Sequence, residues 1–494
     1  MEQRVQVGGS LPLPIPAARE RDTQNPRMVS VLNCGGSGIS RFSYLWARLG
    51  FVILEPNSKS KISSTKFTDQ KAMSIQNLSN ITNQISGISV SEIASQFGTP
   101  TYVYDANTIL GQIEKLRAFD VIRFAQKANS NIAVLDLMRK NGVVVDAVSA
   151  GEVLRAQAAG YDLTDKSHPV VFTADLFDRE ALELVQKYGL HVNAGSPDML
   201  VQLSEICPGA NVTLRINPGF GHGHSQKTNT GGEQSKHGIW HEQLEETVAL
   251  ADKHGLTVTG LHMHIGSGTD FEHLAQVCDS MVAAAKVVGS SLTTISSGGG
   301  LPTPYREGDT TIDIERYFEV WDTARKSLEA EFGHSITLEI EPGRFLVAEC
   351  GYLISEIRAI KKMGNNKFYL VDAGFNNLAR PILYGAYHPM SIAFADGRDS
   401  EPNCESVVVG GPLCESGDIF TQSEGGFVSS CELPTAKVGD VLVIGCAGAY
   451  GFVMSSNYNS KPMTAEVLIL DGKPIEIRKR QSLESLFADE SLPQ

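Results

Sequence analysis

The chain has 494 residues, a formal net charge of −14 and 42% hydrophobic residues, as soluble globular proteins do. Its length is sufficient for two or three domains and a large core. The acidic balance argues against a nucleic-acid or anionic membrane surface, because phosphate recognition requires clustered lysine and arginine. We therefore expect no nucleic-acid partner. No apolar run of the sequence is long enough to cross a bilayer, so we expect no membrane partner either.

The first 72 residues differ in composition from the rest. They carry a charge of about +5, which leaves about −19 for the remainder. They are rich in proline, glycine and serine and show no sustained helical or strand period. A targeting peptide, a disordered tail and a non-native stretch upstream of a start at Met73 are all open interpretations. The acidic residues Glu2, Glu20 and Asp22 make us favour the last two.

Residues 73–105 are expected to lead into the ordered part of the chain. They contain the first convincing helix, at 90–97, and a strand at 101–104. From there to residue 349, apolar strand-like runs alternate with helix-like runs such as 178–188 and 271–288, which predicts a (β/α)8 TIM barrel at 106–349. The eight strands are expected at 121–127, 143–149, 170–174, 190–194, 211–217, 257–265, 293–297 and 336–341.

Two further features complete the predicted organisation. Residues 218–240 are a long insertion rich in glycine, histidine and serine, which we expect to form an ordered loop at the barrel mouth. After residue 350 the helical period fades, and β-like runs with glycine and proline turns predict a mostly β domain at 350–494. The strand at 101–104 is expected to pair into that domain.

Lys127 follows an apolar strand-like run and is the first candidate for chemistry. A lysine at the mouth of a barrel strand should be partly desolvated. Desolvation favours the neutral amine, which is the form that attacks aldehydes. Lys127 is therefore a candidate Schiff-base residue for pyridoxal phosphate, although a strand-end lysine without other support is a weak signal.

Two glycine-containing segments follow the seventh and eighth predicted strands. Gly298, Gly299 and Gly300 allow backbone N–H groups to converge on an anion, and phosphate sites of barrels cluster at this position. Glu341 and Arg344 are three residues apart, so the carboxylate could face a pyridine nitrogen while the guanidinium binds phosphate. A flexible turn and a local ion pair are the alternatives.

His262 and His264 share one face of a predicted strand. Zinc would need further ligands, and His222 and His224 lack a supporting carboxylate or thiolate spacing, so no metal is expected. An imidazole stacked on a cofactor ring, with Ser267 near phosphate, is the better functional interpretation. A hydrogen-bonded core histidine is the alternative.

The eight cysteines form no CxxC pair and no regular framework, which indicates reduced thiols in a cytoplasmic location. Only Cys414 has neighbours that suggest chemistry. It precedes Glu415 on a glycine-punctuated loop, where a thiol could donate a proton and the carboxylate could bind a substrate ammonium. The alternative is an ordinary turn with a buried cysteine.

Taken together, these segments resemble one family from about residue 75 to the C-terminus. The chain is similar to the fold-type III pyridoxal-phosphate decarboxylases, and among them to the diaminopimelate decarboxylases. This implies a barrel of the alanine-racemase type. The stretches that carry the resemblance occur in the family's order and are FAQKANSN (124–131), VDAVSAGE (145–152), LRINPGFGHGHSQKTNTGGEQSKHGI (214–239), HMHIGSG (262–268), SGGG (297–300), EIEPGR (339–344), DAGFNNLARPILYGAYH (372–388), GGPLCESGD (410–418) and GAYGFVMSSNYNS (448–460).

The resemblance implies a role for each matching residue. Lys127 would hold pyridoxal 5'-phosphate through a Schiff base, His264 would stack on its ring, and Glu341 would pair with its pyridine nitrogen. The residues implied around the phosphate and the neighbouring substrate groups are Ser267, Gly298, Gly299, Gly300, Arg344 and Tyr450.

The implied reaction is decarboxylation of meso-2,6-diaminopimelate to L-lysine and CO2, the last step of lysine biosynthesis. Arg380 and Tyr384 would hold the distal carboxylate of the substrate. Cys414 and Glu415 would come from the other subunit of a homodimer with shared active sites. There Cys414 would help to protonate the carbanion, and Glu415 would bind the distal ammonium.

Three alternatives stay open at this point. A decarboxylase of ornithine, arginine or carboxynorspermidine would have less use for a distal carboxylate clamp at Arg380 and Tyr384. A non-catalytic relative would be expected to lack the Schiff-base lysine or the loop cysteine, and this chain has both. A racemase would need a second base on the opposite face of Cα, which the Cys414 loop and the 218–240 insertion do not favour.

Overall fold

A computed structural model describes residues 81–222, 229–309, 311–398 and 403–493. The N-terminal segment of residues 1–72 and the start at Met73 lie outside the described residues. The lead-in consists of β1 (Gln84–Ile85), β2 (Ile88–Ser89) and α1 (Val90–Phe97). Helix α1 begins after Ser89, whose hydroxyl accepts a hydrogen bond from the Glu92 N–H, and it ends at Gly98 with φ 73°. Of the helices in these ranges, none is long and apolar enough to span a membrane.

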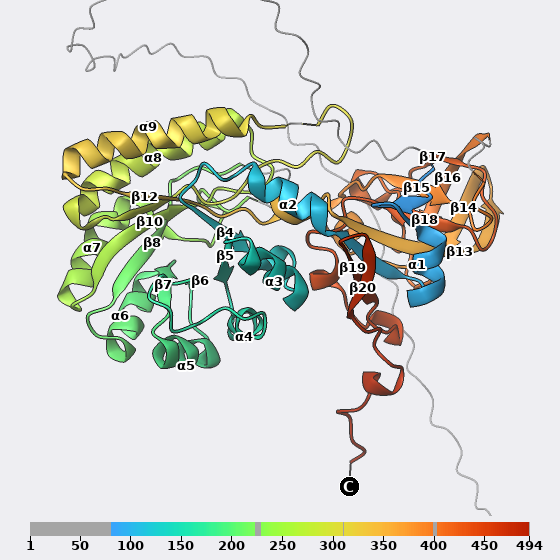
Figure 1. The fold of residues 1–494 in the computed structure, drawn as a ribbon, viewed down its shortest axis with the longest axis horizontal. Helices are drawn as coiled ribbons and strands as arrows, with labels where there is room; N and C mark the ends of the chain where they lie inside the picture. The colour runs from blue at the N-terminus through green and yellow to red at the C-terminus, as the bar shows by residue number, and fades with distance from the viewer. Residues whose placement is uncertain (1–80, 223–228, 310, 399–402, 494) are drawn as a thin grey trace, which may run out of the picture. The chain divides into compact units, whose positions relative to one another are not determined.

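Eight parallel strands form a closed barrel, which confirms the predicted (β/α)8 fold. Neighbours in the chain pair with one another, β10 also pairs with β8, and β12 returns to pair with β4, so the sheet closes on itself (Figure 1). A short ninth strand, β9 (Ile239–Trp240), extends β8. The barrel strands are β4 (Val121–Ala125), β5 (Val144–Ala147), β6 (Val170–Ala174), β7 (His191–Ala194), β8 (Asn211–Asn217), β10 (Thr257–Met263), β11 (Thr294–Ser296) and β12 (Thr337–Ile340).

Helices cover the outside of the barrel (Figure 1). Except for the short, fully buried α10, they are amphipathic: α5, for example, buries Ala181 and Val185 and leaves Arg179 and Glu180 to solvent. Helix α9 buries Tyr317, Trp321 and Leu328 at helical spacing. The helices are α2 (Ala106–Glu114), α3 (Ile132–Lys140), α4 (Ala150–Ala158), α5 (Arg179–Tyr188), α6 (Pro197–Ile206), α7 (Leu244–Lys253), α8 (Phe271–Val288), α9 (Ile314–Phe332) and α10 (Arg344–Val347).

Five barrel strands, β4, β5, β10, β11 and β12, end one or two residues earlier than predicted, and the ends of β4 and β10 place two predicted site residues after their strands. Strand β4 stops at Ala125, and the 3-10 helix η1 (Gln126–Ala128) places Lys127 on a tight turn. Strand β10 stops at Met263, so His264 follows the strand. Apolar periodicity cannot locate such boundaries because the runs continue into the buried turns that form the barrel rim.

The remaining part of the chain is mostly β. Strand β3 (Thr101–Asp105) lies before the barrel in sequence, yet it pairs antiparallel with β13 and parallel with β19. The main strand order is β17-β16-β14-β13-β3-β19-β20, with β18 pairing to β13 and β15. The other strands and the short helix are β13 (Gly351–Met363), β14 (Asn366–Val371), α11 (Arg380–Tyr384), β15 (Met390–Ala393), β16 (Cys404–Gly410), β17 (Cys431–Pro434), β18 (Val441–Ile444), β19 (Ala465–Leu470) and β20 (Lys473–Arg478).

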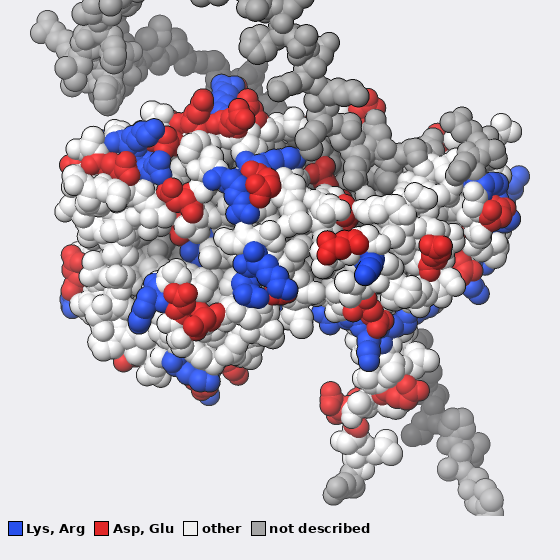
Figure 2. Space-filling model, viewed as in Figure 1, with Lys and Arg blue, Asp and Glu red and all other residues white. Residues whose placement is uncertain are grey.

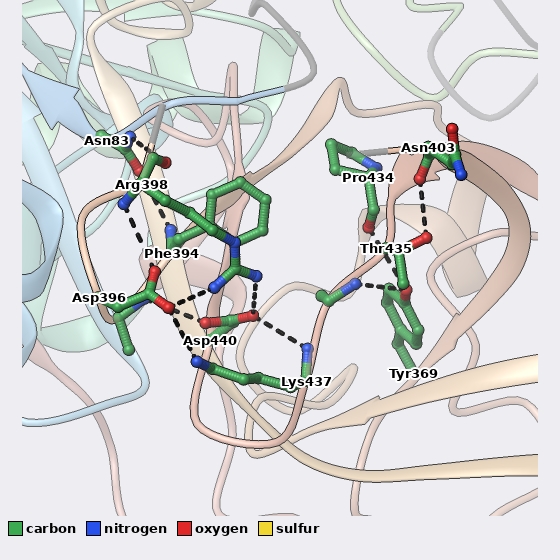
Figure 3. A network of polar contacts seen from close by, with 12 residues as sticks. Asn83, Tyr369, Phe394, Asp396, Arg398, Asn403, Pro434, Thr435, Lys437 and Asp440 are labelled. Atoms are coloured by element: carbon green, nitrogen blue, oxygen red, sulfur yellow. Dashed lines mark hydrogen bonds and ion pairs between the residues drawn. The ribbon is translucent and has the colours of Figure 1, made fainter. Parts of the chain in front are cut away.

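Hydrogen bonds and an ion pair to Asp440 stabilise the loop after β15 (Figure 3). The Asp440 carboxylate is fully buried and accepts hydrogen bonds from the Ala395 N–H (3.0 Å) and the Lys437 N–H (2.9 Å). The Arg398 guanidinium lies 3.3 Å from the same carboxylate and 3.8 Å from the centre of the Phe394 ring. The buried charge is therefore fully hydrogen-bonded, as a buried carboxylate must be to be tolerated.

Positively and negatively charged side chains are mixed on the surface. On the face drawn in Figure 2, basic and acidic residues lie among uncharged ones, frequently next to each other. Pairs one helical turn apart account for part of this pattern, such as Asp136 with Lys140 at 2.7 Å and Asp322 with Lys326 at 2.7 Å. Exposed pairs of this kind contribute little to stability.

Candidate active site

One pocket lies at the carboxyl-terminal ends of the barrel strands, where barrel enzymes place their catalytic groups. Its lining includes Lys127, His264, Ser267, Glu341 and Arg344. These residues follow β4, β10 and β12, so strands far apart in sequence bring them together. Further residues of the lining are Asp146, Thr173, Arg215, His262, Gly299, Gly300 and Tyr450.

Lys127 lines this pocket but is exposed, so the prediction of a partly desolvated amine is wrong for this chain. Strand β4 ends two residues before Lys127, which lies on the 3-10 turn that follows. Lys127 is nevertheless surrounded by titratable groups. Its positive charge lowers the pKa of the Asp146 carboxyl, although the burial of Asp146 dominates and the net pKa is raised.

Glu341 is buried at the bottom of the pocket. Its carboxylate accepts a hydrogen bond from the Ser296 hydroxyl (2.6 Å) and lies 3.2 Å from His262 Nε2. Burial raises the pKa of Glu341 to about 8, and the negative charge of Asp146 contributes in the same direction. A carboxyl in this state can share a proton with a buried nitrogen base.

His262 and His264 both line the pocket, as expected from their shared face. Burial and the charge of Arg215 lower the pKa of each imidazole well below its ordinary value, so both rings are neutral at neutral pH. Asn193 donates its amide N–H to His262 Nδ1 (2.8 Å). The proton of the neutral His262 ring is therefore on Nε2, which faces Glu341.

The glycine segment after β11 packs too closely for side chains. A Cβ on Gly298 would lie 2.1 Å from the Met263 carbonyl oxygen, and one on Gly299 would lie 2.5 Å from that of Glu341. Gly298 also has φ 63°, a conformation that favours glycine. The backbone of Gly299 and Gly300 therefore forms the pocket wall itself.

Arg344 contacts both barrel loops and a residue of the β domain. Its Nε and Nη2 atoms each lie 3.4 Å from the Ser267 hydroxyl, and its Nη1 donates to the Tyr305 hydroxyl at 2.9 Å. Tyr450 covers the guanidinium, with the ring centre 5.2 Å away. The Tyr450 N–H donates to the Ala128 carbonyl (2.8 Å), which links the β-domain loop to the turn that carries Lys127.

Arg380 and Tyr384 do not line the pocket. They form the ends of helix α11, with Arg380 buried and Tyr384 half-buried. Arg380 nevertheless lies close to the pocket wall, because its guanidinium is 4.8 Å from the ring centre of Tyr305, the residue that binds Arg344.

Cys414 and Glu415 are exposed and also lie outside the pocket lining. The Cys414 N–H donates to Asn459 Oδ1 (2.8 Å), and the buried Asp418 accepts from the Leu413 N–H (2.7 Å). The loop is thus held in shape while its two functional candidates point away from their own chain's core. Cys414 is a free thiol, as are Cys207, Cys278, Cys350, Cys431 and Cys446.

The described part of the 218–240 insertion is anchored at the pocket rim. The Thr230 hydroxyl donates to the His264 carbonyl (3.1 Å), and His237 Nδ1 lies 2.8 Å from Asp175. Asp175 also accepts from the Gly238 N–H at 2.9 Å. These contacts hold residues 229–240 of the insertion at the pocket rim.

Sequence patterns missed several residues of this site. Asp146, Thr173 and Arg215 line the pocket from β5, β6 and β8, and Tyr305 binds Arg344 from a loop. A polar residue inside a buried β-strand, where alternation points it inward, is the signal that could have identified Asp146 and Arg215.

The histidines weighed as metal ligands are separated. His262 and His264 line the pocket, while His222 lies beside Asp270 and His273 with ligand atoms within 4.8 Å of one another. The His222 and His273 rings are stacked at 4.1 Å and 5°. Lone pairs in two parallel ring planes do not converge on one ion, so this cluster is poorly arranged for a metal.

The pocket fits a phosphorylated pyridine aldehyde. It offers an amine at Lys127, a flat neutral ring at His264, a buried carboxyl at Glu341 and a glycine wall beside Arg344. Within the described residues, His262 Nε2 and His264 Nδ1 of the pocket lining are buried without a hydrogen-bond partner. Buried polar atoms of this kind are expected where a ligand binds.

Comparison with known proteins identifies the family. Residues 110–348 match the family model described as "Pyridoxal-dependent decarboxylase, pyridoxal binding domain". The diaminopimelate decarboxylase of Streptomyces coelicolor is 54% identical over 409 residues, which is 83% of this chain and 93% of that protein. The enzyme of that name from Escherichia coli K12 is 54% identical over 402 residues, 81% of this chain and 96% of that protein.

Solved structures agree with this assignment. A crystal structure of a diaminopimelate decarboxylase superposes with a TM-score of 0.81 at 51% identity, covering 84% of this chain and all of that one. The Helicobacter pylori enzyme, solved in complex with L-lysine, superposes with a TM-score of 0.73 at 32% identity, covering 81% of this chain and 98% of that one. The chain therefore belongs to the diaminopimelate decarboxylases, pyridoxal-dependent lyases built on a (β/α)8 barrel.

Proposed function

We propose that this enzyme converts meso-2,6-diaminopimelate to L-lysine and CO2, as the last step of lysine biosynthesis in the cytoplasm. Pyridoxal 5'-phosphate would be held by Lys127, with Gly299, Gly300 and Ser267 near its phosphate. When bound, this cofactor supplies an electron sink for the electron pair left at Cα after CO2 departs. The free thiols of Cys278, Cys350 and Cys446 support a reducing compartment.

The observation that best supports this substrate is a pair of buried arginines without acidic partners. Arg344 and Arg380 are 7% and 6% exposed, and in the described ranges neither has a carboxylate within ion-pair distance. A buried cation without a counterion is costly. Two such cations side by side suit a ligand that brings its own carboxylate.

Glu341 and the two histidines prepare the ring end of the site. The raised pKa of Glu341 lets the carboxyl share a proton with the pyridine nitrogen. His262, protonated on Nε2, lies 3.2 Å from the Glu341 carboxylate. Neutral His264 offers a flat surface without adding positive charge that would compete with that proton.

The distal end of the substrate would be recognised by charge. Arg344, Arg380 and Tyr384 would bind the distal carboxylate, and Tyr450 would pack over Arg344. Ornithine and arginine carry no distal carboxylate, so they would leave both guanidiniums unpaired. The enzyme should therefore discriminate strongly against them, because unpaired buried groups are penalised.

Cys414 and Glu415 would act across the interface of a homodimer. Both are exposed on a well-ordered loop that does not reach its own chain's pocket lining. In a shared site, the Cys414 thiol would deliver the proton that replaces CO2 at Cα. Glu415 would bind the distal ammonium of the substrate.

The deciding experiment measures CO2 release from meso-diaminopimelate, ornithine and arginine with the purified holoenzyme, and determines the chirality of the product. We expect L-lysine from the first substrate and at least about a hundredfold lower kcat/KM for the others. Preference for ornithine or arginine would contradict the proposal. Formation of D-lysine or of a racemic product would indicate racemase-like chemistry instead.

A further inference from the structure

Tyr305 lies between the two arginines proposed to bind the distal carboxylate. Its hydroxyl accepts a hydrogen bond from Arg344 Nη1 at 2.9 Å. Its ring centre is 4.8 Å from the Arg380 guanidinium and 5.8 Å from that of Arg344. The Tyr305 and Arg306 N–H groups both donate to Asp309 at 2.8 Å, which fixes the loop that carries Tyr305.

His388 supports Arg380 from the other side. Arg380 Nη1 lies 2.9 Å from His388 Nε2, and His388 Nδ1 lies 3.0 Å from the Gly445 carbonyl oxygen. A carbonyl can only accept, so the ring proton is on Nδ1, and Nε2 accepts from Arg380. Burial and the Arg380 charge lower the pKa of His388 well below its ordinary value, which keeps the ring a neutral acceptor.

Arg344 and Arg380 would otherwise repel each other. Burial lowers the pKa of Arg380, and the Arg344 charge lowers it further, which shows that the two cations interact. The electron-rich face and hydroxyl oxygen of Tyr305 stabilise both cations without neutralising either. His388 likewise satisfies one guanidinium N–H without contributing a negative charge. The pair thereby keeps its full positive charge for a ligand.

We propose that Tyr305 and His388 are positioning residues that hold Arg344 and Arg380 as a preformed, uncompensated two-guanidinium site for the distal carboxylate. An aspartate or glutamate in either place would hold an arginine equally well, but it would neutralise the site. Neutral acceptors hold the same geometry and leave the charge to be paired by the substrate. This inference rests on the proposed function, which assigns the distal carboxylate to these arginines.

The test compares Tyr305→Phe, His388→Leu and His388→Gln in the holoenzyme. The first two remove an acceptor from one arginine, and we expect each to raise the KM for meso-diaminopimelate about tenfold, with a much smaller change in kcat. The inhibition constant of L-lysine, which keeps the distal carboxylate, should rise in parallel. That of 1,5-diaminopentane, which has no carboxylate, should not change.

His388→Gln separates positioning from packing. Its side-chain carbonyl can accept from Arg380 as Nε2 does, so it should restore most of the affinity lost in His388→Leu. Tyr188→Phe and His334→Gln remove comparable groups at the barrel surface, where Tyr188 bonds Gln157 and His334 lies 3.0 Å from the Ser290 carbonyl oxygen, and should leave all constants unchanged. Equal loss in His388→Gln and His388→Leu, or equal weakening of L-lysine and 1,5-diaminopentane, would overturn the inference.

Arg380→Met distinguishes this inference from the proposed function. If that variant leaves the KM unchanged, the assignment of the distal carboxylate fails. If it raises the KM while Tyr305→Phe and His388→Leu do not, the assignment stands and only the positioning role fails.

Discussion

The cofactor end of the site and the Cys414 loop differ in where their functional side chains lie within one chain: the first are in a pocket and the second are on the surface. Lys127, His264 and Glu341 line one pocket, and their neighbours come from strands of the same barrel. Cys414 and Glu415 are exposed on a loop whose backbone is firmly held. A loop held in this way with exposed reactive side chains is consistent with the proposed shared site, whereas the pocket is lined by one chain, mostly from its barrel and with Tyr450 from the β domain.

The largest effect is expected from Lys127→Ala. Without the amine, no covalent bond to the cofactor can form, and turnover should fall by at least about a thousandfold. The visible absorbance of the bound cofactor should shift to that of the free aldehyde. Substantial residual CO2 release would show that the cofactor end has been assigned to the wrong lysine.

Glu341→Gln should lower kcat by about a hundredfold or more, because an amide cannot share a proton with the ring nitrogen. The same change tests the electrostatics of the pocket. A buried carboxyl with a raised pKa keeps its proton while the unfolded chain loses it, so its contribution to stability falls as pH rises from the ordinary carboxyl range to about 8.

The cofactor-free Glu341→Gln protein should therefore melt at a higher temperature than the cofactor-free wild type at pH 9. The difference should shrink toward pH 4, where the wild-type carboxyl is protonated in both states. Thermal unfolding followed by circular dichroism at both pH values gives the comparison. A difference that is independent of pH would contradict the raised pKa.

Exchange of chains between two inactive variants tests whether Cys414 acts in the active site of a second chain. A one-to-one mixture of Lys127→Ala and Cys414→Ala chains, each inactive alone, should recover about a quarter of wild-type activity, because half of the dimers are hybrid and each has one intact site. Unfolding and refolding the chains together ensures exchange. Absence of recovery in verified hybrids would argue that each site is built within one chain.

The smallest effect is expected away from both regions. Arg398→Met removes one bond to buried Asp440 but leaves its two backbone donors, so the free energy of unfolding should fall by about 1 kcal/mol. Urea denaturation measures this loss, and kcat and KM should not change. A change in KM would mean that this network is coupled to the active site.

Local sequence determined much of the fold. The alternation of apolar runs predicted the barrel because buried parallel strands must be apolar while their covering helices repeat at 3.6 residues. The glycine wall after β11 and the Glu341 turn also follow from short segments, since their function depends on backbone conformation and position at a strand end. The ends of β4 and β10 did not, because residues after each strand, such as Gln126 and Ile265, remain buried.

The tertiary structure alone decided how charge is arranged in the site. Asp146 beside Glu341, and Tyr305 bonded to Arg344, join segments that are tens of residues apart or more. No local pattern reports such contacts, because the energy of a buried charge depends on which groups the folded chain brings near it. The sequence by itself thus determined which reactive groups this protein has, and the fold decided which of them are buried, paired or left exposed.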